Sequence, residues 1–476
     1  MTTFPDEYSE VERPLIDQLQ ALGWQYLAGD TDVPELTERR SFREVLLLGR
    51  LHAAIRRINV DEDGLPWLDD SRVFAAAGEL ERLGAPKLLE ANQLATELLL
   101  KGTAVEGDAL RHDGKEQTVR FLDFAQPERN DFLVVNQLRV DGPGGQRTII
   151  PDLVLFVNGI PLVVIEAKSP AATDPLEAGI TQLLRYTNQR AWVTAEEGAE
   201  QLFHYNQFLV ATCFHQARVG TIGASYEHYL EWKDTSPVPM AQVAQELGVD
   251  HLSSQQTLVA GMLRPAHLLD IVRNFTLFAQ AGGKTIKIVA RYQQFRAVQE
   301  AVRRLLHGQT KAQHGLEDQR GGIIWHTQGS GKSLTMVFLI RKMRTVPGLR
   351  RFKVVIVTDR TDLEQQLSGT ATLTNETVRR ARSAADLQTI LREDGPDLVF
   401  ATIQKYRAPD DEVTVLELER RPAEGQMREV AETPGEYATG GQVLRLPAAE
   451  PDYPLLNEST EILVLVDEAH RSQNNT

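Results

Sequence analysis

A short glycine-rich segment at residues 326–333, with the sequence HTQGSGKS, constrains the fold of this chain more than any other feature. An apolar run precedes it and a helix-like run follows it, so the local order is strand, loop and helix. Glycines in such a loop allow backbone N–H groups to close around phosphates at the N-terminus of the helix. Lys332 is predicted to reach the β- and γ-phosphates of a nucleotide, and Ser333 to bind its Mg²⁺.

The elements predicted after residue 260 alternate between strands and helices. Apolar runs predict strands at 321–327, 352–359, 397–402 and 461–468, and amphipathic runs predict helices at 332–343 and 383–393. This alternation is typical of an α/β, doubly wound parallel sheet. Residues 408–460 interrupt it with 12 acidic residues against four arginines, which predicts a solvated acidic insertion.

Three further residues are candidates for nucleotide chemistry. Asp467 and Glu468 end the last predicted strand, where Asp467 could hold Mg²⁺ through water and Glu468 could activate the attacking water. Gln294 lies upstream in RYQQFRA, and its amide can both donate to and accept from an adenine edge. A polar helix face is the alternative interpretation of Gln294. The loop residues predicted to bind ATP are Thr327, Gln328, Gly329, Ser330, Gly331, Lys332 and Ser333.

A different set of charged residues lies in the first half of the chain, in PDLVLFVNGIPLVVIEAK. Asp152 begins one predicted strand, and Glu166 and Lys168 close the next. Side chains along a strand point to alternate faces of the sheet, so Glu166 and Lys168 share one face. Asp152 lies on the same face if it pairs with Glu166 on the neighbouring strand. That register requires a three-residue loop, Asn158–Ile160, with its glycine in the left-handed conformation.

Two adjacent carboxylates, here Asp152 and Glu166, are suited to binding Mg²⁺, which lowers the pKa of a bound water. A neighbouring lysine could orient or deprotonate that water, or offset charge on a phosphate. A hairpin with ordinary solvated charges at its ends is the alternative. On the first predicted helix, Glu10 or Glu12 could add a further acid, although a solvated helix face is favoured for both.

The chain is predicted to have a mixed α/β domain over 1–235, a linker over 236–260 and a second domain over 261–476. Its net charge of −15 excludes a uniformly basic nucleic-acid-binding surface. A single cysteine, Cys213, excludes an intrachain disulfide and a cysteine-based zinc cluster. The N-terminus is unlike a secretory signal and no apolar run is long enough to span a membrane, so we expect a cytoplasmic protein.

The order of these motifs resembles two known families. PD…ExK followed by Gln182 and Tyr186, four residues apart on a predicted helix over 174–190, resembles the PD-(D/E)xK nuclease fold of the RecB-like kind. The resemblance implies that Asp152, Glu166 and Lys168 are catalytic and that Gln182 and Tyr186 support them near DNA. The glycine-rich loop followed by VDEAH resembles motifs I and II of superfamily 2 helicases, and RYQQFRA resembles their adenine-reading glutamine motif. This implies a first RecA-like lobe that binds ATP.

Longer strings, GGIIWHTQGSGKSLTM and VDEAHRSQ among them, resemble the restriction subunit of type I restriction enzymes, and the resemblance covers nearly the whole chain. The similarity implies ATP-driven translocation and Mg²⁺-dependent cleavage of double-stranded DNA, in a complex with modification and specificity subunits. Only six residues follow the DEAH box, so the chain is expected to match the N-terminal part of such a subunit and to bind nucleotide better than it turns it over. A non-catalytic DNA- or partner-binding fragment, or the nuclease-motor subunit of another ATP-dependent restriction system, are the alternatives.

Overall fold

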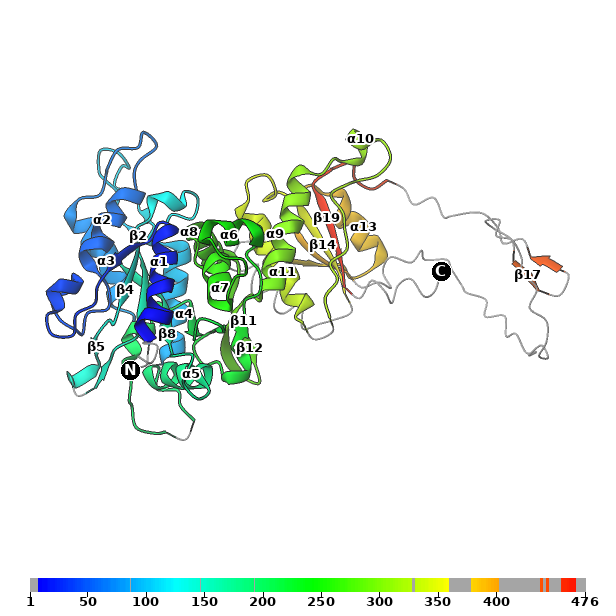
Figure 1. Cartoon of the computed structure of the whole chain (residues 1–476). Helices are drawn as coiled ribbons and strands as arrows, with labels where there is room; N and C mark the ends of the chain where they lie inside the picture. Colours follow the sequence, from blue (N-terminus) through cyan, green and yellow to red (C-terminus); the bar gives the residue numbers. More distant parts are fainter. Residues whose placement is uncertain are drawn as a thin grey trace, which may run out of the picture. The chain divides into compact units, whose positions relative to one another are not determined.

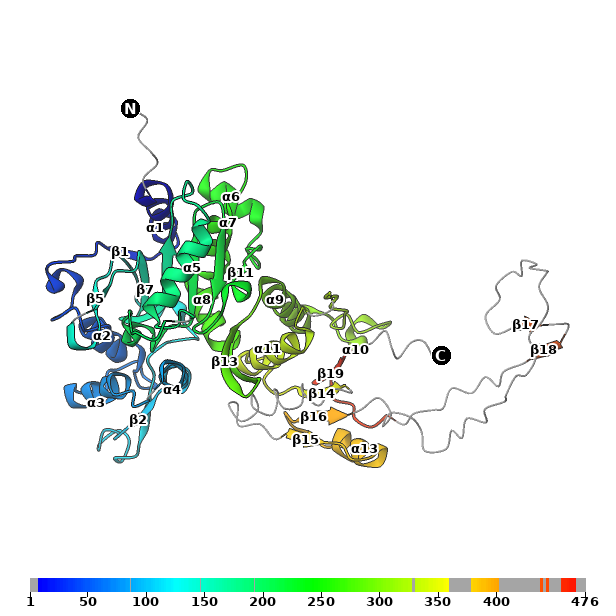
Figure 2. The same cartoon turned by 90° about the horizontal axis from the view of Figure 1, so that it is seen from below.

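The structure is a computed structural model, and it describes most of the chain (Figures 1 and 2). The described residues are 7–85, 87–145, 147–191, 193–327, 330–358, 378–401, 437–439, 442–444 and 455–467. They belong to two compact units, Met1–Lys342 and Met343–Thr476. Among these residues, no helix has the length and apolar character that crossing a membrane requires.

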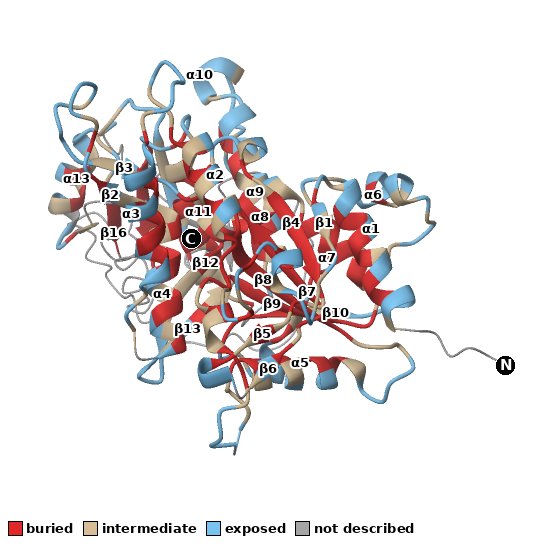
Figure 3. Ribbon diagram, turned by 90° about the vertical axis from the view of Figure 1, so that its left-hand side faces the viewer, coloured by how far each residue is buried: buried red, intermediate tan, exposed pale blue. Residues whose placement is uncertain are grey.

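A seven-stranded mixed sheet forms the centre of the first unit. Its strands, in spatial order, are β1 (Gln25–Leu27), β4 (Phe132–Asn136), β7 (Leu153–Val157), β8 (Ile160–Ala167), β9 (Phe208–Thr212), β10 (Ala217–Gly220) and β11 (Leu230–Glu231). The pairs β1–β4 and β8–β9 are parallel, and the other neighbours are antiparallel. Strands β7, β8 and β9 are buried along their whole length, as Figure 3 shows, because both faces of this part of the sheet are covered.

Helices cover this sheet. The first, α1 (Arg13–Ala21), continues from a π-helical turn, η1 (Tyr8–Glu12), and α5 (Pro175–Tyr186) connects β8 to β9 and packs on both strands (Figure 2). The other helices described up to Thr345, not all of which lie on this sheet, are α2 (Leu48–Ile58), α3 (Asp70–Glu81), α4 (Leu88–Lys101), α6 (Met240–Leu247), α7 (Ser254–Met262), α8 (Pro265–Asn274), α9 (Tyr292–His307), α10 (Lys311–His314) and α11 (Lys332–Thr345). Three small hairpins complete the unit: β2 (Thr103–Val105) with β3 (Gln117–Val119), β5 (Val140–Asp141) with β6 (Thr148–Ile149), and β12 (Thr276–Ala281) with β13 (Lys284–Val289).

Residues 236–260, expected to be a linker, instead form α6 and most of α7. Helix α7 packs against α1, and its apolar side chains are buried. The buried side chain of Gln255 donates to the backbone oxygen of Val11 (3.1 Å) and accepts from the Thr212 hydroxyl (2.8 Å). The linker prediction is wrong because this polar-looking stretch supplies part of the core of the first unit.

The second unit contains a four-stranded, entirely parallel sheet. Its strands, in spatial order, are β15 (Val378–Arg380), β16 (Leu398–Ala401), β14 (Lys353–Val357) and β19 (Ile462–Val466), and α13 (Ala384–Arg392) precedes β16. Leu387 and Ile390 of α13 pack with Val355 and Val399 of the sheet in one apolar cluster. The predicted alternation of parallel strands and helices is therefore present. The 408–460 insertion lies largely outside the described residues, apart from residues 455–460 and a hairpin of β17 (Tyr437–Thr439) and β18 (Gln442–Leu444).

One predicted strand is absent. Residues 321–327 have no regular secondary structure, and Ile323 and Trp325 are 92% and 89% exposed. The sequence prediction fails here because an apolar run indicates a strand only where another strand pairs with it, and no described strand pairs with this one.

Candidate active site

The β7–β8 hairpin turns in a different way from the one predicted. Val157 pairs with Ile160, so the turn contains two residues, Asn158 and Gly159, rather than three. Both have positive φ, 53° and 75°, as a type I′ turn requires. The buried Asn158 side chain also makes hydrogen bonds to neighbouring segments, which stabilise this tighter turn.

A β-bulge then restores the register on which the site depends. Leu162 is an extra residue in β8, so beyond it the pairing shifts by one and Leu153 faces Ile165. The next residues outward on the two strands are Asp152 and Glu166, which therefore lie on the same face. The predicted register is present although the predicted loop is wrong.

Substitution of Gly159 tests how strongly this turn is fixed. A Cβ at Gly159 would lie 2.5 Å from the backbone oxygen of Leu47, whereas one at Gly64, with nearly the same φ of 76°, would meet nothing within 4 Å. We expect Gly64→Ala to cost about 1–2 kcal/mol of unfolding free energy for its left-handed backbone. Gly159→Ala should cost about 2–5 kcal/mol, because the clash adds to that strain. Denaturant unfolding measures both, and equal losses would contradict the clash.

Asp152, Glu166 and Lys168 meet in the structure. Lys168 Nζ lies 2.7 Å from Glu166 Oε1 and 3.7 Å from Asp152 Oδ2. The backbone N–H of Ala167 donates to Asp152 Oδ2 (2.8 Å). Both carboxylates are buried, so the constellation is a buried charged cluster rather than solvated strand ends.

The electrostatics of this cluster favour a bound cation. Burial, and then the neighbouring charge of Asp152, raise the pKa of Glu166 well above its ordinary value. Burial alone would lower the pKa of Lys168, but its attraction to Glu166 and Asp152 outweighs burial and raises it. Glu166 Oε2 is buried and has no hydrogen-bond partner among the described residues. A hard divalent cation would satisfy this oxygen and reduce the repulsion between the carboxylates, so the residues fit Mg²⁺.

Two acids from the N-terminal helical segment extend the cluster. Carboxylate oxygens of Glu7, Glu12 and Asp152 lie within 4.8 Å of one another. Glu12 is buried, whereas Glu10 is exposed, so the expected solvated position is wrong for Glu12. The sequence also gave no reason to select Glu7. Hydrogen-bonded partners in a π-helical turn are five residues apart, the spacing that separates Glu7 from Glu12.

A glutamine was missed as well. The side-chain Nε2 of Gln137 lies 3.1 Å from Asp152 Oδ1 and 3.2 Å from Glu12 Oε1. Its position in the sequence could have indicated it, because Gln137 closely follows the apolar run of β4, just as Glu166 follows the apolar run of β8.

Gln182 and Tyr186 lie together on α5, as predicted from their spacing. Gln182 Nε2 donates to Tyr186 Oη (2.5 Å), and that hydroxyl donates to the backbone oxygen of Ile150 (3.2 Å). Burial, and then the charge of Glu166, raise the pKa of Tyr186, which keeps the phenol neutral.

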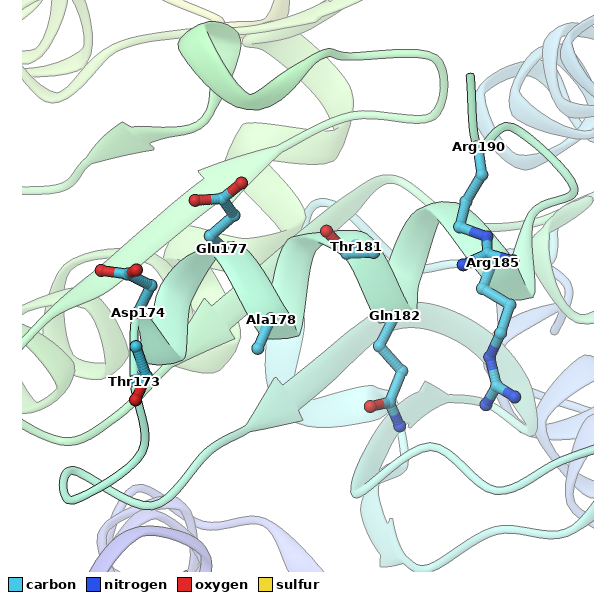
Figure 4. A pocket seen from close by; sticks show the side chains of 8 residues that line it. All are labelled: Thr173, Asp174, Glu177, Ala178, Thr181, Gln182, Arg185 and Arg190. Atoms are coloured by element: carbon cyan, nitrogen blue, oxygen red, sulfur yellow. The ribbon is translucent and has the colours of Figure 1, made fainter. Parts of the chain in front are cut away.

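An open pocket runs along the outer side of α5 (Figure 4). Its lining residues are Thr173, Asp174, Glu177, Ala178, Thr181, Gln182, Arg185 and Arg190. Gln182 and Arg185 project to one side of the helix, whereas Glu177 projects to the other. Gln182 thus contacts the buried Tyr186 and also lines an open surface of mixed charge, on which Arg190 pairs with Glu197.

The glycine-rich loop leads into α11 in the first unit. Lys332 and Ser333 begin this helix, Gly331 has a φ of 86°, and the Ser330 hydroxyl donates to the backbone oxygen of Thr327 (2.6 Å). Gln328 and Gly329 lie outside the described residues. The described part therefore places a lysine, a hydroxyl and free N–H groups of a helix N-terminus together, as nucleotide phosphates require.

Gln294 lies beside this loop. Its Nε2 donates to the backbone oxygen of Gly331 (3.0 Å), and its Oε1 accepts from the backbone N–H of Arg291 (2.9 Å). With 2% exposure it is not part of a solvated helix face.

In the second unit, Asp467 follows β19 and is buried. Its backbone N–H donates to the backbone oxygen of Val357 (3.0 Å), and Glu468 lies outside the described residues.

Two parts of the chain match models of known protein families. Residues 5–228 match the family model described as type I restriction enzyme R protein N terminus, and residues 293–476 match the SWI2/SNF2 ATPase model. The two matches follow one another in the order that the motifs predicted.

Individual relatives agree. The chain is 33% identical, over 98% of its length, to the type I restriction enzyme HindI endonuclease subunit of Haemophilus influenzae. It is 28% identical, also over 98%, to a Methanocaldococcus jannaschii protein provisionally named type I restriction enzyme MjaIXP endonuclease subunit. It spans 39% and 40% of these two proteins, about two fifths of their length. The chain is therefore similar over nearly its whole length to type I restriction enzyme endonuclease subunits, which confirms the predicted resemblance.

Proposed function

We propose that this chain provides the DNA-cleaving and ATP-binding functions of a type I restriction endonuclease subunit. The observation that carries the proposal is the buried cluster of Asp152, Glu166 and Lys168, in which one carboxylate oxygen has no partner among the described residues. The match of the C-terminal region to an ATPase family supports the second function. Its double-stranded DNA substrate, its modification and specificity partners and its cytoplasmic location belong to the same proposal.

We infer that the first unit contains a PD-(D/E)xK nuclease fold and that the parallel sheet of the second unit belongs to a RecA-like lobe. The acids at neighbouring strand ends of a mixed sheet, with α5 crossing between β8 and β9, support the first assignment. The parallel order β15-β16-β14-β19 supports the second. Within these folds we assign cleavage to 1–235 and nucleotide binding to 261–476.

For cleavage, Asp152 and Glu166 would hold Mg²⁺, with Glu12 within reach of the same site. The metal supplies a Lewis acid for the phosphate and lowers the pKa of a bound water. The raised pKa of Lys168 keeps its ammonium protonated, so this side chain stabilises negative charge that develops on the phosphate. Tyr186 accepts a hydrogen bond from Gln182, whose side chain also lines the open pocket along α5, where an amide can contact the DNA backbone.

For nucleotide binding, we propose the roles that the motifs imply for the residues of each unit: in the first, Lys332 contacts the phosphates and Ser333 binds Mg²⁺; in the second, Asp467 binds Mg²⁺ and Glu468 activates water. The loop residues Thr327, Gln328, Gly329, Ser330 and Gly331 would surround the phosphates. Gln294 would read adenine, since its amide already lies 3.0 Å from the loop at Gly331.

Cleavage of a mixed-sequence plasmid tests this function. We expect Mg²⁺-dependent nicking that EDTA abolishes, with cut ends that share no sequence, because carboxylates and a lysine carry no base-reading pattern. Nicking should fall steeply with salt, because non-specific DNA affinity depends on neutralised phosphates. A reproducible short recognition sequence at the ends would instead indicate a self-sufficient restriction enzyme. Binding of DNA without any nicking would favour a non-catalytic fragment.

A further inference from the structure

The Gln137 side chain lies between two acids that come from distant parts of the chain. Its Nε2 is 3.1 Å from Asp152 Oδ1, and 3.2 and 3.4 Å from the two carboxylate oxygens of Glu12. An amide NH₂ group has two hydrogens, so it can donate one to each carboxylate. Neither the PD…ExK pattern nor the Gln182–Tyr186 pair includes this residue.

The backbone fixes Gln137 in this position. Its φ is 47°, in the left-handed region that a residue with a side chain seldom adopts. Its N–H donates to the backbone oxygen of Asp152 (2.8 Å), so main chain and side chain contact the same residue. A Cβ at Gly29 would lie 1.8 Å from the backbone oxygen of Asn136, which shows that the segment just after β1 approaches the end of β4 closely here. An uncommon conformation held from several sides is typical of a functional position.

We infer that Gln137 is the positioning residue of the cation site. It holds Glu12, from the N-terminal helical segment, next to Asp152, from the sheet, so that both can bind one divalent cation. This inference rests on the proposed function and extends it, because it names the group that assembles the ligands. Without the amide, two buried carboxylates repel each other with no donor between them, and the Glu12 side chain moves away from Asp152.

Gln137→Met tests this role, because methionine keeps the length of the side chain and removes its donor. Both residues are unbranched, so the left-handed backbone costs them about the same. Isothermal titration of the full chain with Mn²⁺ alone should show affinity about 10- to 100-fold weaker than wild type. The Mg²⁺ concentration for half-maximal plasmid nicking should rise by a similar factor, and excess Mg²⁺ should restore the wild-type rate.

Gln25→Met is the matched control. Gln25 lies in β1 of the same sheet and donates to Asp131 (3.0 Å), away from the acid cluster, so both measurements should be unchanged. If Gln137→Met does not fold, Gln137→Asn replaces it: the shortened amide cannot reach both carboxylates, and Mn²⁺ affinity should again fall.

Three results would overturn the inference. If the Gln137 variant binds Mn²⁺ with wild-type affinity, Gln137 does not position the ligands, whereas the proposed nuclease function is not contradicted. Unchanged affinity with a lower rate at saturating Mg²⁺ would indicate a structural role alone. Absence of Mn²⁺ binding by the wild-type chain would contradict the proposed nuclease site itself, and with it the inference about Gln137.

Discussion

Replacing Lys168 with methionine is expected to reduce Mg²⁺-dependent DNA cleavage by about 10²- to 10³-fold while ATP binding stays unchanged. Lys168 Nζ lies 2.7 Å from Glu166 and 3.7 Å from Asp152, and methionine removes this charge at nearly constant length. The lost group is the cation that we assign to stabilising the phosphate as negative charge develops on it. Plasmid nicking and equilibrium binding of a fluorescent ATP analogue measure the two activities.

Lys233→Met provides the control for that experiment. Lys233 pairs with Glu231 (3.1 Å) on the surface, where both side chains are largely solvated, so its loss should leave nicking unchanged. A wild-type rate of nicking in Lys168→Met would show that this lysine takes no part in the reaction. Equal loss of nicking and ATP binding would show that the two functions do not depend on separate residues.

The sequence was sufficient to predict the meeting of Asp152, Glu166 and Lys168. Strand alternation determines which side chains share a face, and the long apolar runs left little choice of strand. The turn was predicted incorrectly, because an extra residue can be taken up either in a loop or in a bulge within the strand. The structure uses the bulge at Leu162, and the choice depends on contacts that the buried Asn158 makes with distant segments.

Residues that depend on packing could not be predicted in this way. Glu12 is buried because its helical turn lies next to Asp152 at the start of β7, whereas Glu10, two positions earlier, is exposed. Residues 236–260 looked like a linker, yet α7 packs on α1, which precedes it by more than 200 residues. In both cases burial is decided by a partner that is remote in sequence, and local composition carries no information about it.

Replacing Lys332 with alanine is expected to weaken ATP binding by about 30-fold or more, because losing one partner of a desolvated charge pair costs about 2–5 kcal/mol. Lys332 is the first residue of α11, directly after Gly331, whose backbone oxygen is held by Gln294. Its ammonium would be the lysine charge nearest the bound phosphates. Isothermal titration with Mg²⁺–ATP measures the loss.

Two comparisons make the Lys332 result specific. Lys311→Ala removes an exposed lysine from α10 of the same unit and should leave ATP affinity unchanged. Mn²⁺ binding at the acid cluster should also be unchanged in Lys332→Ala, because Asp152 and Glu166 are held by the sheet and by Lys168. Wild-type ATP affinity in Lys332→Ala would exclude the loop as the phosphate site. Loss of Mn²⁺ binding in the same variant, measured without nucleotide, would instead mean that the substitution disrupts the first unit, because no proposed ligand of the acid-cluster cation lies in this loop.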